Sequence, residues 1–278
     1  MTYADGHLAR EPAATALSDG RAIDLTSATQ RVDELRAEYQ AAQPWPHLVL
    51  HGLFPDSMLT AAKREAMQIS ASELKRDANR AQVKDETTHL PGPVSEELFR
   101  FLDGAEFTGL LEGVTGVKDL LPDPTHLYGG LHRFPAGGFT LVHRDFRRHP
   151  VTTLHHRVNA LLYLNEDWKP EYGGFLELWP SDMSAAAKTI APQKNTLVMW
   201  ETHDQTLHGL PDPLKCPEHD ARVALAAYYY TREPRAEKVK RRGPVVVRRP
   251  QDPWTAGRRG PKQLLSTLIN RTKRSKAA

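Results

Sequence analysis

Hydrophobic and polar residues follow two different spacings along this chain. In the N-terminal half, apolar residues recur every three or four positions, as Val32, Leu35 and Tyr39 do. That spacing places apolar side chains on one face of a helix. The pattern predicts, in order, a helix over 28–42 capped by Thr26 or Ser27, a strand over 47–50, a helix beginning near Pro55, a polar loop or lid over 72–93 and a helix from residue 94.

From about residue 127 the spacing changes to short apolar runs that Gly, Pro and Asn interrupt. Runs of this length between turn-forming residues are typical of strands. The predicted strands are 127–134, 139–145, 157–165, 174–179, 195–200, 206–210 and 222–231. Seven short strands in succession predict a sandwich or barrel-like β core, with the earlier helices packed outside it.

Charge divides the chain at a later point. Residues 232–278 carry 15 Lys and Arg against 3 Asp and Glu, whereas residues 1–231 carry 22 against 31. This split predicts an acidic body, with flexible residues 1–20 in front of it and a basic tail behind it. Apolar residues between 264 and 269 share one face of a short amphipathic helix in that tail. The tail could pack on the body, bind a partner protein or lie on a membrane surface, whereas nucleic acid is disfavoured because no binding motif accompanies the charge.

The chain shows no signal for a membrane span or for export. It has no run of 18 or more apolar residues, and residues 1–22 lack a basic segment followed by an apolar one. The single cysteine, Cys216, excludes an internal disulfide and is typical of a reducing compartment. We therefore expect a cytoplasmic protein in which Cys216 is an ordinary thiol.

One predicted strand carries His143 and Asp145, two positions apart in GGFTLVHRDF. Side chains two apart on a strand project from the same side, so an imidazole and a carboxylate converge there. By itself the pair could be an ordinary hydrogen-bonded pair on an exposed face. His208, in the later segment QTLHGL, could supply a third ligand, because two histidines and one carboxylate form the facial triad of non-haem Fe(II) oxygenases. Arg222 opens the last predicted strand fourteen residues after His208.

Together these segments resemble the Fe(II)/2-oxoglutarate-dependent dioxygenase superfamily, in particular its prolyl-4-hydroxylase-like branch. HRD, RVNALLYLNEDWKPEYGGFLELWP, NTLVMW and RVALAAYYYT occur in the family's order between about residues 131 and 231, with PWPHLVLHGLFP upstream. The resemblance implies a double-stranded β-helix (jelly-roll) core over about 127–231, within a dioxygenase domain over 21–231. It also implies Fe(II), 2-oxoglutarate and O2, with ascorbate as a further candidate.

The resemblance assigns roles to the matching positions. His143, Asp145 and His208 would hold the iron. Arg222 would bind the distal carboxylate of 2-oxoglutarate, a task suited to its planar, permanently charged fork. Tyr163 matches a tyrosine that helps hold this carboxylate in relatives, and the alternative is a half-buried core tyrosine.

Several neighbouring residues carry weaker expectations. Asn159 shares a strand face with Tyr163, so we expect it to line the same cavity. The connection 209–221 is longer than is usual in this branch, and it either bulges outward or shapes the substrate entrance. Trp168 and Trp179 are expected to pack in the core. Solvated loop positions, with substrate contact as the alternative, are expected for Arg147, Arg148, His149, His155, His156 and Arg157.

The implied reaction is hydroxylation of an unactivated C–H bond, coupled to conversion of 2-oxoglutarate to succinate and CO2. Related halogenases have a small residue in place of the carboxylate, so that chloride can bind, whereas this chain retains Asp145. The substrate is a small molecule or a peptide: peptidyl proline, an amino acid, a natural product or a glycan. Two other functions stay open, a non-catalytic sensor of metal and 2-oxoglutarate and a nucleic-acid-directed oxygenase that uses the basic tail.

Overall fold

The structure, a computed structural model, describes residues 25–70, 72–88, 90–232 and 244–252. Residues 1–20 and the helix expected near residues 264–269 lie outside these ranges. The helices are α1 (Thr26–Gln30), α2 (Val32–Ala41), α3 (Asp56–Gln68), α4 (Pro93–Leu102), α5 (Ala105–Thr115) and the 3-10 turn η1 (Pro170–Tyr172). The strands are β1 (His47–His51), β2 (Lys75–Ala78), β3 (Gln82–Thr87), β4 (Leu121–Pro122), β5 (Gly130–Pro135), β6 (Phe139–Arg144), β7 (His155–Tyr163), β8 (Leu176–Trp179), β9 (Lys188–Ile190), β10 (Thr196–Glu201), β11 (Leu207–Leu210), β12 (Ala221–Thr231) and β13 (Val245–Val246). None of the described helices is long and apolar enough to cross a bilayer.

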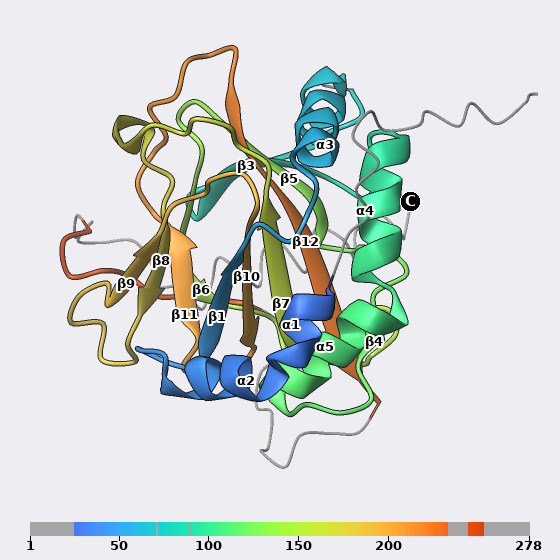
Figure 1. The fold of residues 1–278 in the computed structure, drawn as a ribbon. Helices are drawn as coiled ribbons and strands as arrows, with labels where there is room; N and C mark the ends of the chain where they lie inside the picture. Colours follow the sequence, from blue (N-terminus) through green and yellow to red (C-terminus); the bar gives the residue numbers. More distant parts are fainter. Residues whose placement is uncertain (1–24, 71, 89, 233–243, 253–278) are drawn as a thin grey trace, which may run out of the picture.

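The described strands form one antiparallel sheet that curls back on itself (Figure 1). Its order is β1-β10-β7-β12-β5-β3-β6-β11-β8-β9, with β13 beside β6, β2 beside β3 and β4 beside β12. Strand β3 connects the two halves, because its residues Asp85 to Thr87 pair with β5 and its residues Gln82 and Val83 pair with β6. The predicted jelly-roll core is therefore confirmed, and all seven predicted strands are present, as β5, β6, β7, β8, β10, β11 and β12.

The helices cover one face of the larger half of the sheet. Leu59 in α3, Phe99 in α4 and Leu111 in α5 are buried in one cluster with Leu162 of β7 and Leu225 of β12. Because side chains alternate along a strand, the neighbours of these strand residues project to the opposite face, toward the interior of the curled sheet. Hydrophobic burial against the helices thus fixes which strand positions are left to line the interior.

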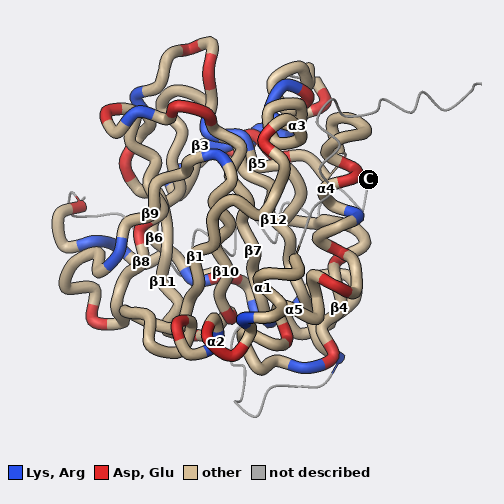
Figure 2. The backbone as a smooth tube through the Cα atoms, in the orientation of Figure 1, with Lys and Arg blue, Asp and Glu red and all other residues tan. Residues whose placement is uncertain are grey.

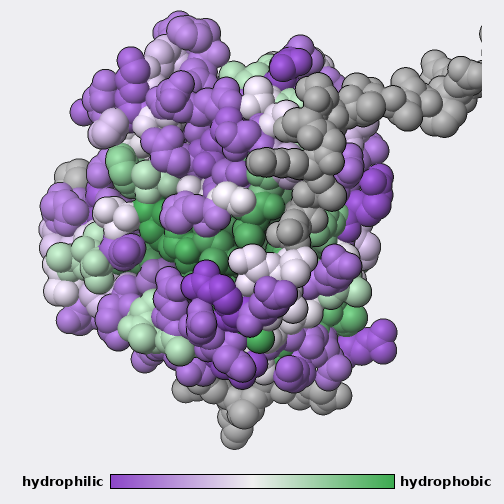
Figure 3. Space-filling view, in the orientation of Figure 1, coloured by the Kyte–Doolittle hydropathy of each residue, from purple (hydrophilic) through white to green (hydrophobic). Residues whose placement is uncertain are grey.

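Charged residues surround this core. Figure 2 shows Lys, Arg, Asp and Glu mainly on helices, loops and strand ends, while β1, β7 and β10 are uncharged along most of their length. On the same side of the molecule, Figure 3 shows an apolar region at the centre with hydrophilic residues around it. Apolar residues therefore reach the surface at the centre of this side.

The polar segment 72–93 is largely a hairpin, so its interpretation as a loop or lid is wrong. Strands β2 and β3 pair with each other, and β3 joins the main sheet. Charged side chains lie on both faces of β3, which removes the apolar alternation that identifies a strand. Asp85 lies 3.5 Å from Arg133, and Glu86 lies 2.8 Å from Lys84. The pair of Asp85 with Arg133 joins two strands that only the folded sheet brings close together, whereas Lys84 and Glu86 are two positions apart on β3.

The N-terminal predictions need one refinement. The helix predicted over 28–42 is divided at Arg31 into α1 and α2, whereas the predicted strand at 47–50 and the helices after Pro55 and from residue 94 are confirmed as β1, α3 and α4. Helix α5 and the short strands β4, β9 and β13 are additional elements. They are short or follow directly on another element, so they lack a distinct pattern of their own.

Truncation of Leu111 to alanine tests the helical layer. The Leu111 side chain is completely buried, at 0% exposure. Leu111→Ala should lower the free energy of unfolding by about 2–5 kcal/mol, because it removes buried methyl groups and leaves a cavity. Urea unfolding followed by circular dichroism measures the loss. Val151→Ala, at a residue that is 72% exposed, should change it by less than about 0.5 kcal/mol, and an equally small effect at Leu111 would contradict this packing.

Candidate active site

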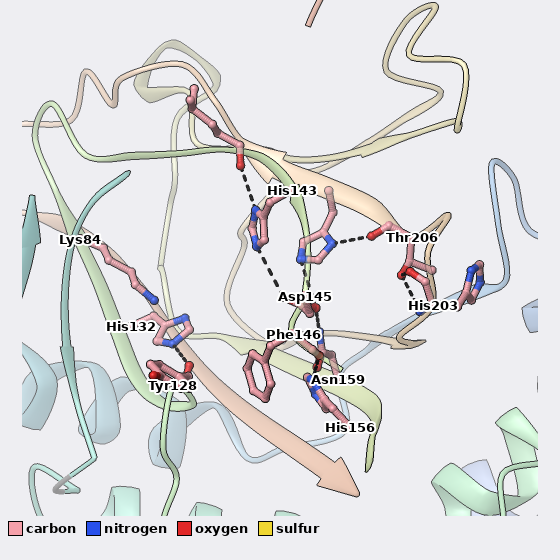
Figure 4. Close-up of polar contacts among 12 residues, drawn as sticks. Lys84, Tyr128, His132, His143, Asp145, Phe146, His156, Asn159, His203 and Thr206 are labelled. Carbon is pink, nitrogen blue, oxygen red and sulfur yellow. Dashed lines mark hydrogen bonds and ion pairs between the residues drawn. The ribbon is translucent and has the colours of Figure 1, made fainter. Parts of the chain in front are cut away.

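Three side chains from two neighbouring strands converge inside the curled sheet. Strand β6 carries His143 and ends beside Asp145, and β11 carries His208 directly opposite His143. His143 Nε2 lies 3.5 Å from Asp145 Oδ1, and His208 Nε2 lies 3.7 Å from Asp145 Oδ2. One ligand atom from each residue lies within 4.8 Å of the other two. Figure 4 shows His143 and Asp145 pointing toward each other, so the structure brings together the three residues that the sequence singles out.

Backbone carbonyls determine the tautomer of both histidines. His143 Nδ1 lies 2.9 Å from the carbonyl oxygen of Leu141, and His208 Nδ1 lies 3.1 Å from that of Thr206. Because a carbonyl oxygen only accepts hydrogen bonds, each Nδ1 carries a proton, and Nε2 is the ring nitrogen that each histidine turns toward Asp145. Burial lowers the pKa of His208 to about 4, although Asp145 acts in the opposite direction, so this ring is neutral near pH 7.

The Asp145 carboxylate is held from a second side. Burial alone would raise its pKa, but His208 and His143 outweigh burial and hold the pKa of Asp145 well below its ordinary value. Asn159, buried on β7, donates its side-chain N–H to Asp145 Oδ2 at 2.6 Å. Asn159 thus faces the interior, and its amide orients the carboxylate.

A cation fits among these atoms. Two Nε2 lone pairs and a carboxylate that face one another are electrostatically unfavourable unless a positive ion lies between them. Imidazole nitrogens with one carboxylate suit Fe(II) and leave other coordination positions open. The hydrogen bonds from both rings to backbone carbonyls and from Asn159 to Asp145 are of the kind that orient metal ligands. The donor set therefore fits the iron that the resemblance implies.

Arg222 is a buried cation on the interior face of β12. Its side chain donates from Nε to the carbonyl oxygen of Gly174 at 2.7 Å and from Nη2 to the Tyr163 hydroxyl oxygen at 3.1 Å. Its guanidinium carbon lies 4.8 Å from the ring centre of Tyr163 and 5.3 Å from that of Phe134. Burial lowers the pKa of Arg222 and raises that of Tyr163.

No carboxylate of the described residues forms an ion pair with this guanidinium. A buried charge without a counter-ion is costly, so the pocket around Arg222 favours a ligand that carries a negative group. Ala224 lies opposite Tyr163 in the sheet, and Ala226 follows it on the same face of β12. Both side chains are small, and they share the interior face of β12 with Arg222. The structure therefore brings the Tyr163 and Arg222 side chains into direct contact.

A second polar group lines the interior from β3 and β5, and the sequence alone does not reveal it. Burial raises the pKa of Glu86, but the charges of Lys84 and His132 and the hydrogen bonds from Lys75 and Lys84 lower it to about 2. Burial also lowers the pKa of His132 to about 3, and its Nε2 donates to the Tyr128 carbonyl oxygen at 3.0 Å. Figure 4 places Lys84 and His132 beside each other near the three converging side chains. Lys75, Lys84 and Glu86 follow no apolar spacing, so in the sequence only the number of charged residues within 72–93 points to them.

Aromatic side chains form the wall next to Asp145. Phe146 stacks on His156, with ring centres 4.7 Å apart, and lies 5.4 Å from Tyr128. Tyr128 is 43% exposed, so this wall reaches solvent. Tyr228 continues it, at 4.8 Å from His156. The wall offers an apolar surface beside the candidate metal centre.

The expectation of solvated loop histidines after the metal strand is wrong. His155 and His156 belong to β7, which begins two residues earlier than predicted, and both are buried. His149 is also buried, with Nε2 at 3.3 Å from Asp123 Oδ2 and Nδ1 accepting the N–H of Thr152 at 3.0 Å. Arg147 is buried as well, and it donates to the carbonyl oxygen of Thr202 at 3.2 Å. These polar side chains are buried beside partners that lie far away in the sequence. The loop-like composition of the segment does not indicate such partners.

The connection 209–221 packs against the fold near Arg222. Leu214 exchanges backbone hydrogen bonds with the turn between β5 and β6, through Gly137 and Gly138. Its side chain packs with Phe134, Trp168 and the buried thiol Cys216. At Gly174, which has φ of +70°, a Cβ would lie 2.3 Å from Leu214 Cδ2 and 3.0 Å from Arg222 Cδ. The connection thus closes the side of the pocket next to Arg222, and Trp168 and Trp179 pack as expected.

Comparison with known proteins agrees with this geometry. Residues 129–230 match the 2OG-Fe(II) oxygenase superfamily. A prolyl-4-hydroxylase of Pseudomonas putida is similar at 16% identity, over 74% of this chain and 100% of that chain, with a TM-score of 0.51. A prolyl hydroxylase of Trichoplax adhaerens, solved with a peptide fragment of the hypoxia inducible factor oxygen degradation domain, has 15% identity over 74% and 91%, with a TM-score of 0.54. Prolyl 4-hydroxylases of Phytophthora capsici have 20% identity over 79% and 69%, with a TM-score of 0.54. No curated protein matches the chain.

These findings define the class of protein. Residues 129–230, which match the 2OG-Fe(II) oxygenase superfamily, contain the converging triad and Arg222. The protein is thus a 2-oxoglutarate-dependent dioxygenase with the fold of the prolyl hydroxylases. Its cofactors are Fe(II) and 2-oxoglutarate, and O2 follows from the oxygenase class. Ascorbate and the cytoplasmic location stay predictions.

Proposed function

We propose that this protein hydroxylates an unactivated C–H bond of a small molecule or a peptide, with His143, Asp145 and His208 as iron ligands and Arg222 as the 2-oxoglutarate anchor. One observation carries the proposal. A triad of metal-binding geometry and a buried guanidinium without a described carboxylate partner line the same interior. A dicarboxylate that chelates the metal at one end and reaches a cation at the other suits this combination.

Each residue of the site has a separate role in the proposed reaction. With Fe(II), 2-oxoglutarate and O2 bound, the site would convert R–H to R–OH while 2-oxoglutarate becomes succinate and CO2. His143 and His208 present their Nε2 atoms to the metal, because Nδ1 of each ring is bound to a backbone carbonyl. Tyr163 and Arg222 bind the distal carboxylate, and the apolar wall around Phe146 limits access of water.

The substrate opening supports both substrate classes. Exposed Tyr128 over Phe146 offers a surface for an apolar or ring-shaped group, and Lys84 with Glu86 offers charged groups of both signs on β3. The Trichoplax adhaerens enzyme was solved with a peptide fragment, and this supports a peptide as one candidate. Hydroxylation is proposed over halogenation, because the Asp145 carboxylate occupies the position that chloride would need.

The test is succinate formation by the purified protein with Fe(II), 2-oxoglutarate and O2, first alone and then with peptide and small-molecule libraries. We expect slow succinate formation without substrate, faster formation with the right substrate, and a product heavier by one oxygen atom. A chlorinated product in chloride buffer would contradict hydroxylation. Binding of both Fe(II) and 2-oxoglutarate without any succinate would favour the non-catalytic sensor. The basic tail lies mostly outside the described residues, and salt-sensitive nucleic-acid binding would favour its alternative role.

Removing the Asn159 amide should weaken metal binding. Asn159→Ala takes away the donor that orients the Asp145 carboxylate. Loss of such an outer contact typically reduces metal affinity by about 10–100-fold. Anaerobic titration with Fe(II) measures this, with the melting temperature of the metal-free protein as a control for folding. Unchanged affinity in a folded variant would mean that Asn159 does not orient the carboxylate.

A further inference from the structure

The segment 244–252 lies along the strand that carries the metal-site residues, although it falls outside the family match at 129–230. In β13, Val246 is paired with His143 and Val245 with Arg144. The N–H of Val247 donates to the Val142 carbonyl oxygen at 2.8 Å. Figure 1 shows this segment in red.

Strand β13 completes the edge of β6 where β3 stops. Strand β11 occupies one side of β6, from Thr140 to His143. On the other side, β3 pairs only with Phe139 and Thr140, at the start of the strand. The end of β6 that leads to Asp145 would therefore present unpaired backbone groups on this side if β13 were absent, and unpaired edges are free to fray.

Arg249 fastens this segment to the elements around β11. Its guanidinium binds Asp212 through both terminal nitrogens, at 3.0 and 2.7 Å, and its Nε binds Asp252 at 3.0 Å. Glu177 of β8 lies 3.8 Å away. Asp212 lies two residues after the end of β11, and Glu177 lies within β8. The contacts of Arg249 therefore connect residues 244–252 to both of these strands. Arg249 is 8% exposed, and a two-pronged pair of this kind fixes direction as well as distance.

The same segment also packs on the outer face of the sheet, behind both metal-site histidines. Val247 packs against a cluster that contains Val142, Leu207 and Trp179. Val142 precedes His143 and Leu207 precedes His208, and neighbours on a strand point to opposite faces. Packing of Val247 against Val142 and Leu207 on the outer face of the sheet therefore restrains His143 and His208, which point to the inner face.

We propose that residues 244–252 form a C-terminal clasp that positions the iron ligands, with Arg249 as its positioning residue. The proposal rests on the proposed function, because it concerns the same metal centre. Release of the Arg249 anchor would let β13 leave β6, and His143 and Asp145 would then sample a wider range of positions. Metal affinity would fall while the helical core stays folded, because α1 to α5 pack on the other half of the sheet.

The test compares Fe(II) dissociation constants of the full chain, measured anaerobically well below the melting temperature. Arg249→Met and Asp212→Asn should each weaken Fe(II) binding by about tenfold, as loss of outer support for metal ligands does. Asp212 is 71% exposed at its side chain, so Asp212→Asn will fold even if Arg249→Met does not. The double variant should lose little more than Arg249→Met alone, because without Arg249 the Asp212 side chain has no clasp contact left to break. Arg249→Lys, which keeps the charge without the fork, should fall between them and the wild type.

Leu111→Ala is the control that separates positioning from stability. It destabilises the helical layer without touching the clasp, so we expect it to bind Fe(II) as the wild type does. Wild-type affinity in both Arg249→Met and Asp212→Asn would overturn the clasp and leave the proposed function intact. A loss in Leu111→Ala as large as in the clasp variants would reduce the effect to general stability and also overturn it. Failure of the wild type to bind Fe(II) would overturn the proposed function and the clasp with it.

Discussion

Asp145→Ala is expected to reduce 2-oxoglutarate-dependent succinate formation by more than about 100-fold, beyond the cost of losing an outer contact to a metal ligand. The change removes the only carboxylate among the three converging side chains and leaves two imidazoles. Fe(II) binding should weaken with it, because the carboxylate supplies both a ligand and the charge that opposes the cation. Succinate release and anaerobic Fe(II) titration measure the two effects.

Asp145→Asn sharpens this result. The amide has nearly the same shape but no charge, so a comparable loss would show that the charge matters as well as the space. The exposed Asp182→Ala is the matched control, and it should retain full activity because Asp182 lies on a surface loop. Near-normal iron binding and succinate formation in Asp145→Ala would remove the metal centre from the proposal, and the dyad would then be an ordinary hydrogen-bonded pair.

Arg222→Met should raise the KM for 2-oxoglutarate by about 10–100-fold. A hydrogen bond to a charged group contributes about 1.5–3 kcal/mol, and every 1.4 kcal/mol is tenfold in affinity. Arg222→Lys should also bind weakly, because a lysine keeps the charge but cannot form two parallel hydrogen bonds to a carboxylate. Steady-state kinetics with varied 2-oxoglutarate measures both, and Tyr163→Phe should show a smaller increase, since it removes one neutral donor.

The unfolding stability of Arg222→Met shows whether Arg222 binds 2-oxoglutarate or instead stabilises the fold. A buried guanidinium without a carboxylate partner among the described residues costs desolvation in the free protein. Arg222→Met should therefore unfold at the same or a higher denaturant concentration than the wild type when 2-oxoglutarate is absent. A large loss of stability with an unchanged KM would contradict the anchor role and would assign Arg222 to the fold.

The sequence indicates much of the core and of the candidate site because these depend on local alternation. Side chains along a strand repeat their direction every two residues, so His143 and Asp145 share a face wherever the strand lies in the fold. The same alternation puts Asn159 and Tyr163 on one face of β7, opposite to Leu162, which packs on the helices. Short apolar runs between turn residues sufficed to place all the central strands.

Tertiary structure alone decided the features that depend on pairs of polar residues far apart in the chain. Strand β3 buries charged side chains, so the burial of Asp85 depends on partners such as Arg133 of β5. The burial of His149 depends on Asp123 in the same way.

The clasp is the clearest example. Arg249 and Asp212 are 37 residues apart, and nothing in a basic, Pro-interrupted segment indicates that one arginine folds back against β6 and β11. Hydrophobic periodicity is a local property and can be read along the chain, whereas charge pairing across a sheet depends on register, which exists only once the strands have met. The sequence by itself therefore determined the strands and the faces that carry the candidate ligands. The tertiary structure decided what surrounds those ligands and holds them in place.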